Sequence, residues 1–112
     1  MTPELVVQRQ LDAYNARDLQ AFVAQYRDDV QVFRPPAVAP VLSGKPAFAD
    51  FYAQERFNLP ALEAQILNRI VMGNKVIDHE RISGVRAEPF DAVAVYQVID
   101  GLISAVWFFA PD

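Results

Sequence analysis

The spacing of apolar residues divides the chain into a helical first part and a β-rich second part. Near the start, Val7, Leu11 and Tyr14 fall at positions i, i+4 and i+7, which gives a helix one apolar face. Thr2 can cap this helix and Pro3 can occupy its first position. The pattern therefore predicts a first helix that begins at Pro3.

A second helix is predicted after the Asn-Ala-Arg-Asp turn at residues 15–18, with Asp18 as its cap. Its expected apolar face is formed by Leu19, Phe22, Val23 and Tyr26. Over residues 30–33 the apolar period shortens towards two, which is typical of a strand.

Three prolines in residues 34–40 exclude regular structure there, because proline lacks a backbone donor and fixes φ. This segment is either a stiff loop over the mouth of a cavity or a plain surface connector. A third helix is predicted to open at residues 43–46 and to end before Asn58 and Pro60.

From Leu62 onwards the pattern is typical of strands. Four strands are predicted, over residues 62–72, 75–83, 90–99 and 102–109. The pairs Gly73-Asn74 and Asp100-Gly101 favour tight hairpin turns between them. The element order predicts an α+β fold in which three helices pack on one face of a strongly bent antiparallel sheet.

Length and composition narrow the class of protein. A chain of 112 residues, 53% of them hydrophobic, predicts a single domain over residues 1–112 with an ample core. The absence of cysteine excludes disulfides and thiolate metal sites. The first residues lack the pattern of a secretory signal, and the longest apolar run, residues 102–110, is about half a membrane span. We therefore expect a cytoplasmic protein that does not enter a membrane.

The charge pattern disfavours nucleic acid as a partner. The net charge is −4, and the ten basic residues form neither a run nor a helical stripe. A phosphate backbone needs a positive protein surface, which this sequence does not predict.

The element order resembles the nuclear transport factor 2-like superfamily, and within it the SnoaL-like and ketosteroid isomerase-like proteins. The segments that carry the resemblance are residues 6–9, 15–19, 28–32, 43–45 and 100–103. The resemblance implies a cone-shaped fold around a deep hydrophobic pocket for a small molecule. It also implies a homodimer formed through the face of the sheet.

The isomerases of this family use a carboxylate base, a tyrosine hydroxyl and a protonated aspartic acid. By the resemblance, the base position corresponds to Arg34 ahead of Pro35, the hydroxyl position to Gln10, and the second acid to the region of Val95. A guanidinium cannot accept a proton at neutral pH. Tyr14 lies one turn beyond Gln10 and is a different position, and the Asp-Arg-Asp set of limonene-epoxide hydrolases has no convincing match.

The densest polar cluster on a predicted strand is Asp78, His79, Glu80 and Arg81. Alternation places Asp78 and Glu80 on one face and His79 and Arg81 on the other, without indicating which face lies inward. Asp78, His79 and Glu80 are candidate catalytic residues, with His79 or Glu80 as general base. The alternative is one solvated pair and one pair in salt bridges at a dimer surface. A lone histidine does not indicate a metal site.

Aromatic residues on the expected pocket elements are candidate ligand contacts. With Arg34, which would bind an anionic group or pair with Asp28 or Asp29, the candidates are Tyr14, Phe33, Tyr52, Tyr96, Trp107 and Phe109. Each aromatic residue taken singly is also explained by core packing. Two hypotheses follow: an isomerase or hydrolase acting without a cofactor on a hydrophobic metabolite, or a non-catalytic ligand-binding or dimeric association module.

Overall fold

The structure, a computed structural model, describes residues 1–111. Within these residues three helices are present: α1 (Pro3–Asn15), α2 (Leu19–Val23) and α3 (Lys45–Glu55). Six strands form one sheet: β1 (Tyr26–Phe33), β2 (Leu42–Ser43), β3 (Glu63–Met72), β4 (Lys75–Ser83), β5 (Phe90–Ile99) and β6 (Leu102–Phe109). In this part of the chain, no helix has the length and apolar character needed to cross a bilayer.

Side-chain caps start the first two helices where the sequence predicts them. The Thr2 hydroxyl accepts a hydrogen bond from the Leu5 amide at 3.2 Å, and the Asp18 carboxylate accepts one from Ala21 at 3.1 Å. The second helix is shorter than predicted, because it ends at Val23 and Tyr26 begins β1. The helical period therefore does not extend to Tyr26.

The strand order is β2-β1-β6-β5-β4-β3. Strands β3 to β6 form the antiparallel meander that the sequence predicts, whereas β1 pairs with β6 in parallel. The sheet is therefore mixed, and β2 adds a short edge strand that the sequence does not reveal. Register shifts interrupt the β3–β4 and β5–β6 ladders, with the extra residue in β3 at Leu67 and in β6 at Ser104, and such irregularities bend a sheet.

The two tight turns are confirmed. The register pairs Met72 with Lys75 and Ile99 with Leu102, which leaves two residues in each loop. Asp100 and Gly101 both have positive φ, at 53° and 79°, as a type I′ turn requires.

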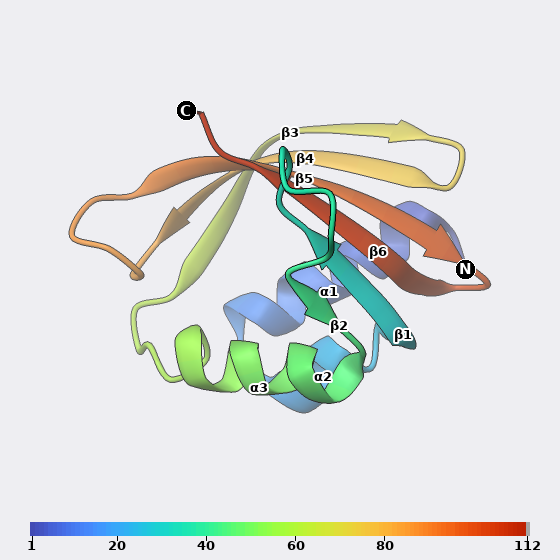
Figure 1. The fold of residues 1–112 in the computed structure, drawn as a ribbon. Helices are drawn as coiled ribbons and strands as arrows, with labels where there is room; N and C mark the ends of the chain where they lie inside the picture. Colours follow the sequence, from blue (N-terminus) through green and yellow to red (C-terminus); the bar gives the residue numbers. More distant parts are fainter. Residues whose placement is uncertain (112) are drawn as a thin grey trace.

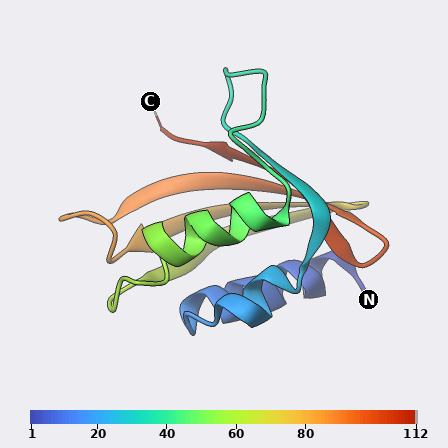
Figure 2. The ribbon, with the colours of Figure 1, turned by 60° about the horizontal axis from the view of Figure 1, so that its bottom comes forward.

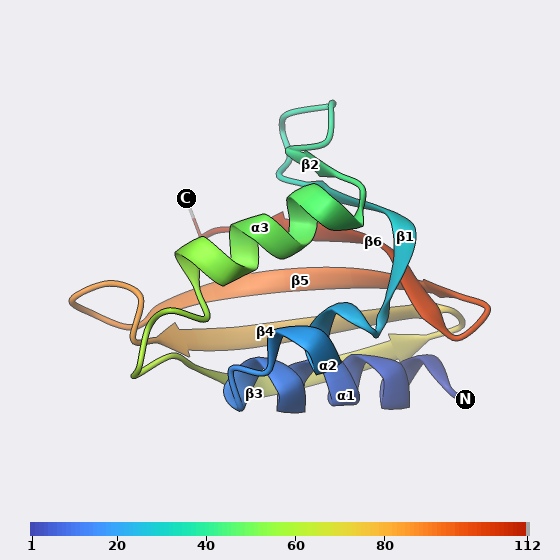
Figure 3. The same ribbon diagram turned by 90° about the horizontal axis from the view of Figure 1, so that it is seen from below.

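All three helices lie against one face of the curved sheet, which arches over them (Figure 1). The turned views show α1 and α2 side by side against one part of the sheet, with α3 running along the other part of the same face (Figures 2 and 3). The core between these layers contains Phe22 and Phe48, whose rings stack with centroids 5.7 Å apart. The α+β fold is thereby confirmed.

The connections at one end of the sheet approach each other closely at Gly84. A Cβ atom there would lie 2.2 Å from the Ala61 carbonyl oxygen, and Gly84 has a φ of +85°. Only glycine allows this approach without a shift of the backbone. The β4–β5 connection is thus held against the α3–β3 connection.

Candidate functional site

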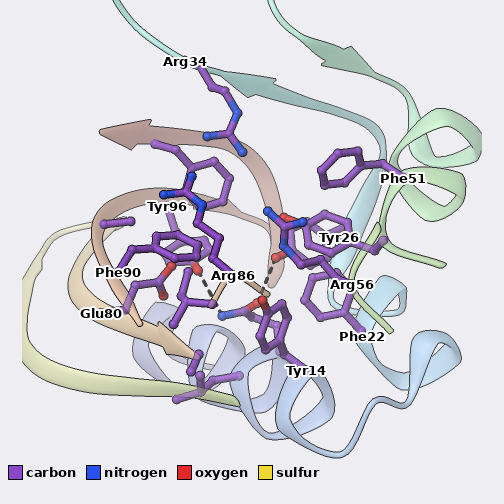
Figure 4. Close-up of a pocket in the computed structure, with 17 residues that line it drawn as sticks. Tyr14, Phe22, Tyr26, Arg34, Phe51, Arg56, Glu80, Arg86, Phe90 and Tyr96 are labelled. Carbon is purple, nitrogen blue, oxygen red and sulfur yellow. Dashed lines mark hydrogen bonds between the residues drawn. The ribbon is translucent and has the colours of Figure 1, made fainter. Parts of the chain in front are cut away.

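A cavity of about 220 Å³ lies between the concave face of the sheet and the helices. Its aromatic lining is Tyr14, Phe22, Tyr26, Phe51, Tyr52, Phe90, Tyr96 and Phe108. Its polar side chains are Gln10, Arg34, Arg56, Glu80 and Arg86 (Figure 4). The cavity therefore combines apolar walls with several groups able to bind or transfer a proton.

Strand β4 turns its carboxylates inward. Asp78 and Glu80 have relative exposures of 0% and 6%, whereas His79 and Arg81 lie on the opposite face. The sequence left this choice open, and the structure separates Glu80 from the histidine beside it.

The Glu80 carboxylate lies in the cavity without a compensating partner. Burial, and then the negative charge of Asp78, raise its pKa from 4.5 to about 7. No hydrogen bond and no cation within residues 1–111 opposes this rise in pKa. A carboxylate with such a pKa is poised to exchange protons near neutral pH.

Asp78, in contrast, has a structural role. Its two carboxylate oxygens accept hydrogen bonds from Arg69 Nε and Nη2, at 2.7 and 2.9 Å. The remaining Arg69 nitrogen, Nη1, donates to Gln8 Oε1 at 2.8 Å and so ties β3 and β4 to α1. Asp78 is therefore a structural anchor that also raises the pKa of Glu80.

Gln10 organises two of the tyrosine hydroxyls. Its Nε2 donates to the Tyr96 hydroxyl oxygen at 3.2 Å, and its Oε1 accepts from the Tyr26 hydroxyl at 3.0 Å. The hydroxyl hydrogen of Tyr96 therefore stays available for a ligand, whereas that of Tyr26 is used. The sequence predicted no role for Gln10 beyond the absence of a hydroxyl at its position.

The cavity tyrosines remain protonated at neutral pH. Burial raises the pKa of Tyr14 to about 12, even though the Arg56 guanidinium acts to lower it. Burial likewise raises the pKa values of Tyr52 and Tyr96 above the usual range. These hydroxyls can therefore donate hydrogen bonds to an oxygen that gains negative charge.

Three arginines with no acidic partner within residues 1–111 line the cavity: Arg34, Arg56 and Arg86. The two carboxylates proposed as partners of Arg34 pair elsewhere, Asp28 with Lys45 and Asp29 with Arg27. The sequence did not single out Arg56 or Arg86, because each lies in a connecting segment whose place relative to the sheet it does not reveal.

Phe33, Trp107 and Phe109 lie outside this cavity, in contrast to the sequence-based prediction. Phe33 and Trp107 stack at 5.4 Å on neighbouring strands, away from the helices, and Phe109 is 42% exposed. The adjacent Phe108 lines the cavity instead. Residues 105–109 are all apolar, so alternation gives no signal for the inward face.

His79 also lies outside the cavity. Its Nε2 is 2.9 Å from the Asp91 carboxylate, which Arg81 contacts at 2.9 Å from the same face. Within the described residues, no group of three or more histidine, cysteine or acidic side chains could hold a metal ion.

A curved sheet packed against three helices is the fold of the nuclear transport factor 2-like class of proteins, and the family match supports this class. Residues 7–106 match the SnoaL-like domain family, and the chain belongs to this family. No curated protein matches the sequence.

Solved structures support the same fold. An uncharacterised cystatin-fold protein from Novosphingobium aromaticivorans is 26% identical, with a TM-score of 0.87 over 96% of this chain and 97% of that one. A Kribbella flavida protein provisionally named a ketosteroid isomerase is 20% identical, with a TM-score of 0.84 over 98% and 78%. A Sinorhizobium meliloti protein provisionally named a polyketide cyclase is 20% identical, with a TM-score of 0.78 over 92% of each chain.

Proposed function

We propose that this protein is a cofactor-independent enzyme of the isomerase type, in which Glu80 transfers a proton on a small carbonyl compound bound in the cavity. The observation that carries this proposal is the buried, unpaired Glu80 carboxylate with its pKa near 7. A buried carboxyl group that faces a cavity and has no structural partner is typical of a catalytic acid or base.

The reaction begins with the Glu80 carboxylate accepting a proton from the carbon next to the ligand carbonyl. The C–H electron pair forms a carbon–carbon double bond, and the carbonyl pair moves to oxygen, which becomes an enolate. In a β,γ-unsaturated carbonyl compound this enolate is conjugated with a second double bond. Glu80 then returns the proton to the far carbon of that double bond while the carbonyl re-forms, so the product is the conjugated isomer and no cofactor is needed.

Tyr14 and Tyr96 are the donors placed to stabilise the enolate oxygen. The charge of Glu80 contributes to the raised pKa of both tyrosines, so both hydroxyls lie within electrostatic reach of the base. Gln10 fixes the Tyr96 oxygen without using its hydrogen. Such preorganised donors stabilise a developing oxyanion.

This arrangement differs from the one that the family resemblance implies. Arg34 stands at the expected position of the base, and the proposed base comes from β4 instead. Asp78 acts through its charge on Glu80 and through Arg69, and His79 takes no part.

The test uses two carbon acids, cyclohex-3-enone and phenylpyruvate, in D₂O, with NMR detection of deuterium at the carbon next to the carbonyl. The wild type should accelerate exchange, with a rate that rises with pH through about 7, because the ionised form of Glu80 is the base. Glu80→Gln should lower the rate by about a hundredfold or more. The matched control Glu63→Gln, at an exposed position of β3, should leave it unchanged.

Absence of acceleration with both compounds, or equal rates for wild type and Glu80→Gln, would overturn the enzyme proposal. The alternative function is then a non-catalytic ligand-binding module. Arg34 at the usual position of the base favours this alternative, as does the likeness to a structure described as a computationally designed 17-OHP binder, with a TM-score of 0.82 and 15% identity.

A further inference from the structure

We infer that the ligand of this cavity is a small organic anion, whose carboxylate or equivalent group is held by Arg34, Arg56 and Arg86 while its apolar body extends towards Glu80. This inference rests on the proposed use of the cavity and names the chemical class of its ligand. It starts from the number of positive charges that converge on one cavity in a chain whose net charge is −4.

The three arginines have no structural task that accounts for their charge. No carboxylate in residues 1–111 lies within 4.0 Å of any of them, whereas Arg27, Arg69 and Arg81 each contact one. Arg56 donates to the Glu55 backbone carbonyl at 2.9 Å, and its guanidinium also acts on the Tyr14 hydroxyl, a neutral partner that does not balance its charge. Their charge therefore lacks a partner that a bound anion would supply.

Each guanidinium is held by an aromatic ring of the cavity wall. The Arg34 carbon lies 5.0 Å from the Phe108 ring centroid, that of Arg56 5.5 Å from Phe51, and that of Arg86 4.1 Å from Phe90. Stacking on a ring leaves the N–H groups at the edge of the guanidinium plane free to donate. The rings thus orient the donors and also provide an apolar surface beside them.

The arginines act on the cavity tyrosines and not on the Glu80 carboxylate. Charges of Arg34 and Arg56 act on the Tyr52 hydroxyl, yet no arginine contributes to the pKa of Glu80. Figure 4 shows Arg34 entering from the opposite side of the view from Tyr14. Arg34 therefore places one end of the anion site away from Tyr14, whereas Arg56, which also acts to lower the pKa of Tyr14, brings positive charge towards the proposed enolate donors.

The volume limits the size of this anion. A cavity of about 220 Å³ holds about seven waters at roughly 30 Å³ each, which corresponds to a ligand of about ten non-hydrogen atoms. A single ring with a short acidic side chain has this size. Phenylacetate and phenylacetamide are suitable probes, because they share one shape and differ in charge.

The experiment measures the dissociation constants of both probes by ligand-observed NMR for the folded wild type and for Arg34→Gln, Arg56→Gln, Arg86→Gln and the triple variant. We expect the wild type to bind phenylacetate about tenfold more tightly than phenylacetamide, with a preference that weakens as salt is added. Each single variant should lose about three- to tenfold in phenylacetate affinity, and the triple variant should lose the preference. The control Arg27→Gln, whose guanidinium pairs with Asp29, should bind as the wild type does.

Equal affinity for the two probes, or a triple variant that keeps the preference for phenylacetate, would overturn the inference. Circular dichroism of each variant distinguishes loss of folding from loss of binding. If Arg56→Gln unfolds, the single variants at the exposed Arg34 and Arg86 provide the test. Glu80→Gln makes the two proposals distinguishable. Preferential binding of phenylacetate without deuterium exchange in the assay above leaves the anion inference standing and removes the enzyme, whereas Glu80-dependent exchange without a charge preference does the reverse.

Discussion

Asp78 and Glu80 lie two residues apart on the inner side of β4, but the surroundings of their two buried carboxylates differ. Around Asp78 the space between α1, β3 and β4 is closed, and Arg69 donates to both carboxylate oxygens. Around Glu80 the same concave surface opens into a cavity, where burial raises the pKa of the carboxyl to about 7.

The comparison shows that burial alone does not give a carboxylate its role. A buried carboxylate that accepts two hydrogen bonds from a cationic partner holds secondary-structure elements together. A buried carboxylate without such a partner destabilises the fold and gains reactivity. The unfavourable electrostatic energy of a buried, unpaired charge is therefore located at the cavity, where the proposed reaction would use that charge. Changes at Asp78 and Glu80 test this contrast, and changes at Trp107 and Asp91 test the outer face of the same sheet.

The largest effect is expected for Asp78→Ala. The substitution leaves the mostly buried Arg69 without its carboxylate, so we expect a loss of about 3–5 kcal/mol in the free energy of unfolding. Urea denaturation at pH 7 provides the measurement. The matched double variant Asp78→Leu with Arg69→Met removes both charges and should lose less, and a single variant as stable as the wild type would remove the contrast.

Glu80→Gln should have the opposite sign. Because the folded pKa of about 7 lies above the ordinary 4.5, the wild type loses stability as pH rises through this interval, and the neutral amide does not. The variant should be more stable than the wild type by about 3 kcal/mol at pH 8 and equally stable near pH 4. Unfolding curves from pH 4 to 8 measure this difference, with Glu63→Gln as the exposed control. Parallel profiles for wild type and Glu80→Gln would contradict it.

The predicted homodimer would form through the face of the sheet that the helices leave uncovered. Phe33, Val95 and Trp107 are half-buried there, and a second copy would cover them. We expect light scattering to give twice the monomer mass of 12.6 kDa for the wild type and the monomer mass for Trp107→Glu. Val38→Glu, at a loop position 92% exposed, is the control. A wild type that stays monomeric at micromolar concentration would refute the dimer.

The smallest effect is expected for Asp91→Asn on the same outer face. Arg81, and then His79, hold the pKa of Asp91 below its usual value. The associated stability is present above the ordinary aspartate pKa and is lost as pH falls through the lowered value, and solvent screens most of it. Thermal unfolding should therefore give a Tm close to that of the wild type at pH 7, and a drop as large as that for Asp78→Ala would show that this outer pair matters equally.

Most of the fold could be predicted from local signals in the sequence. Thr2 and Asp18 mark helix starts through their side-chain oxygens, and the pair Asp100-Gly101 specifies a turn with two positive φ values. These features depend on neighbours within a few residues. The parallel pairing of β1 with β6 and the short β2 depend on contacts distant in the chain, so no local pattern reveals them.

The site was less accessible to sequence reasoning for the same reason. Alternation on β4 separates Glu80 from His79, but the choice between them depends on which face the helices cover. Gln10 acquires its role only when Tyr26 and Tyr96 approach it from two distant strands. Arg56 and Arg86 were missed because they lie outside regular strands and carry no periodic signal.

The two ends of the sheet place different limits on how such a protein can diverge. At one end the two-residue turns at 73–74 and 100–101 leave no freedom to insert or delete residues without shifting the strand register. At the other, Arg56 and Arg86 project from the longer α3–β3 and β4–β5 connections, which meet at Gly84. Substitutions and length changes in these two connections can therefore alter ligand choice while the framework stays intact. Related sequences, and libraries made for new specificities, should vary most there.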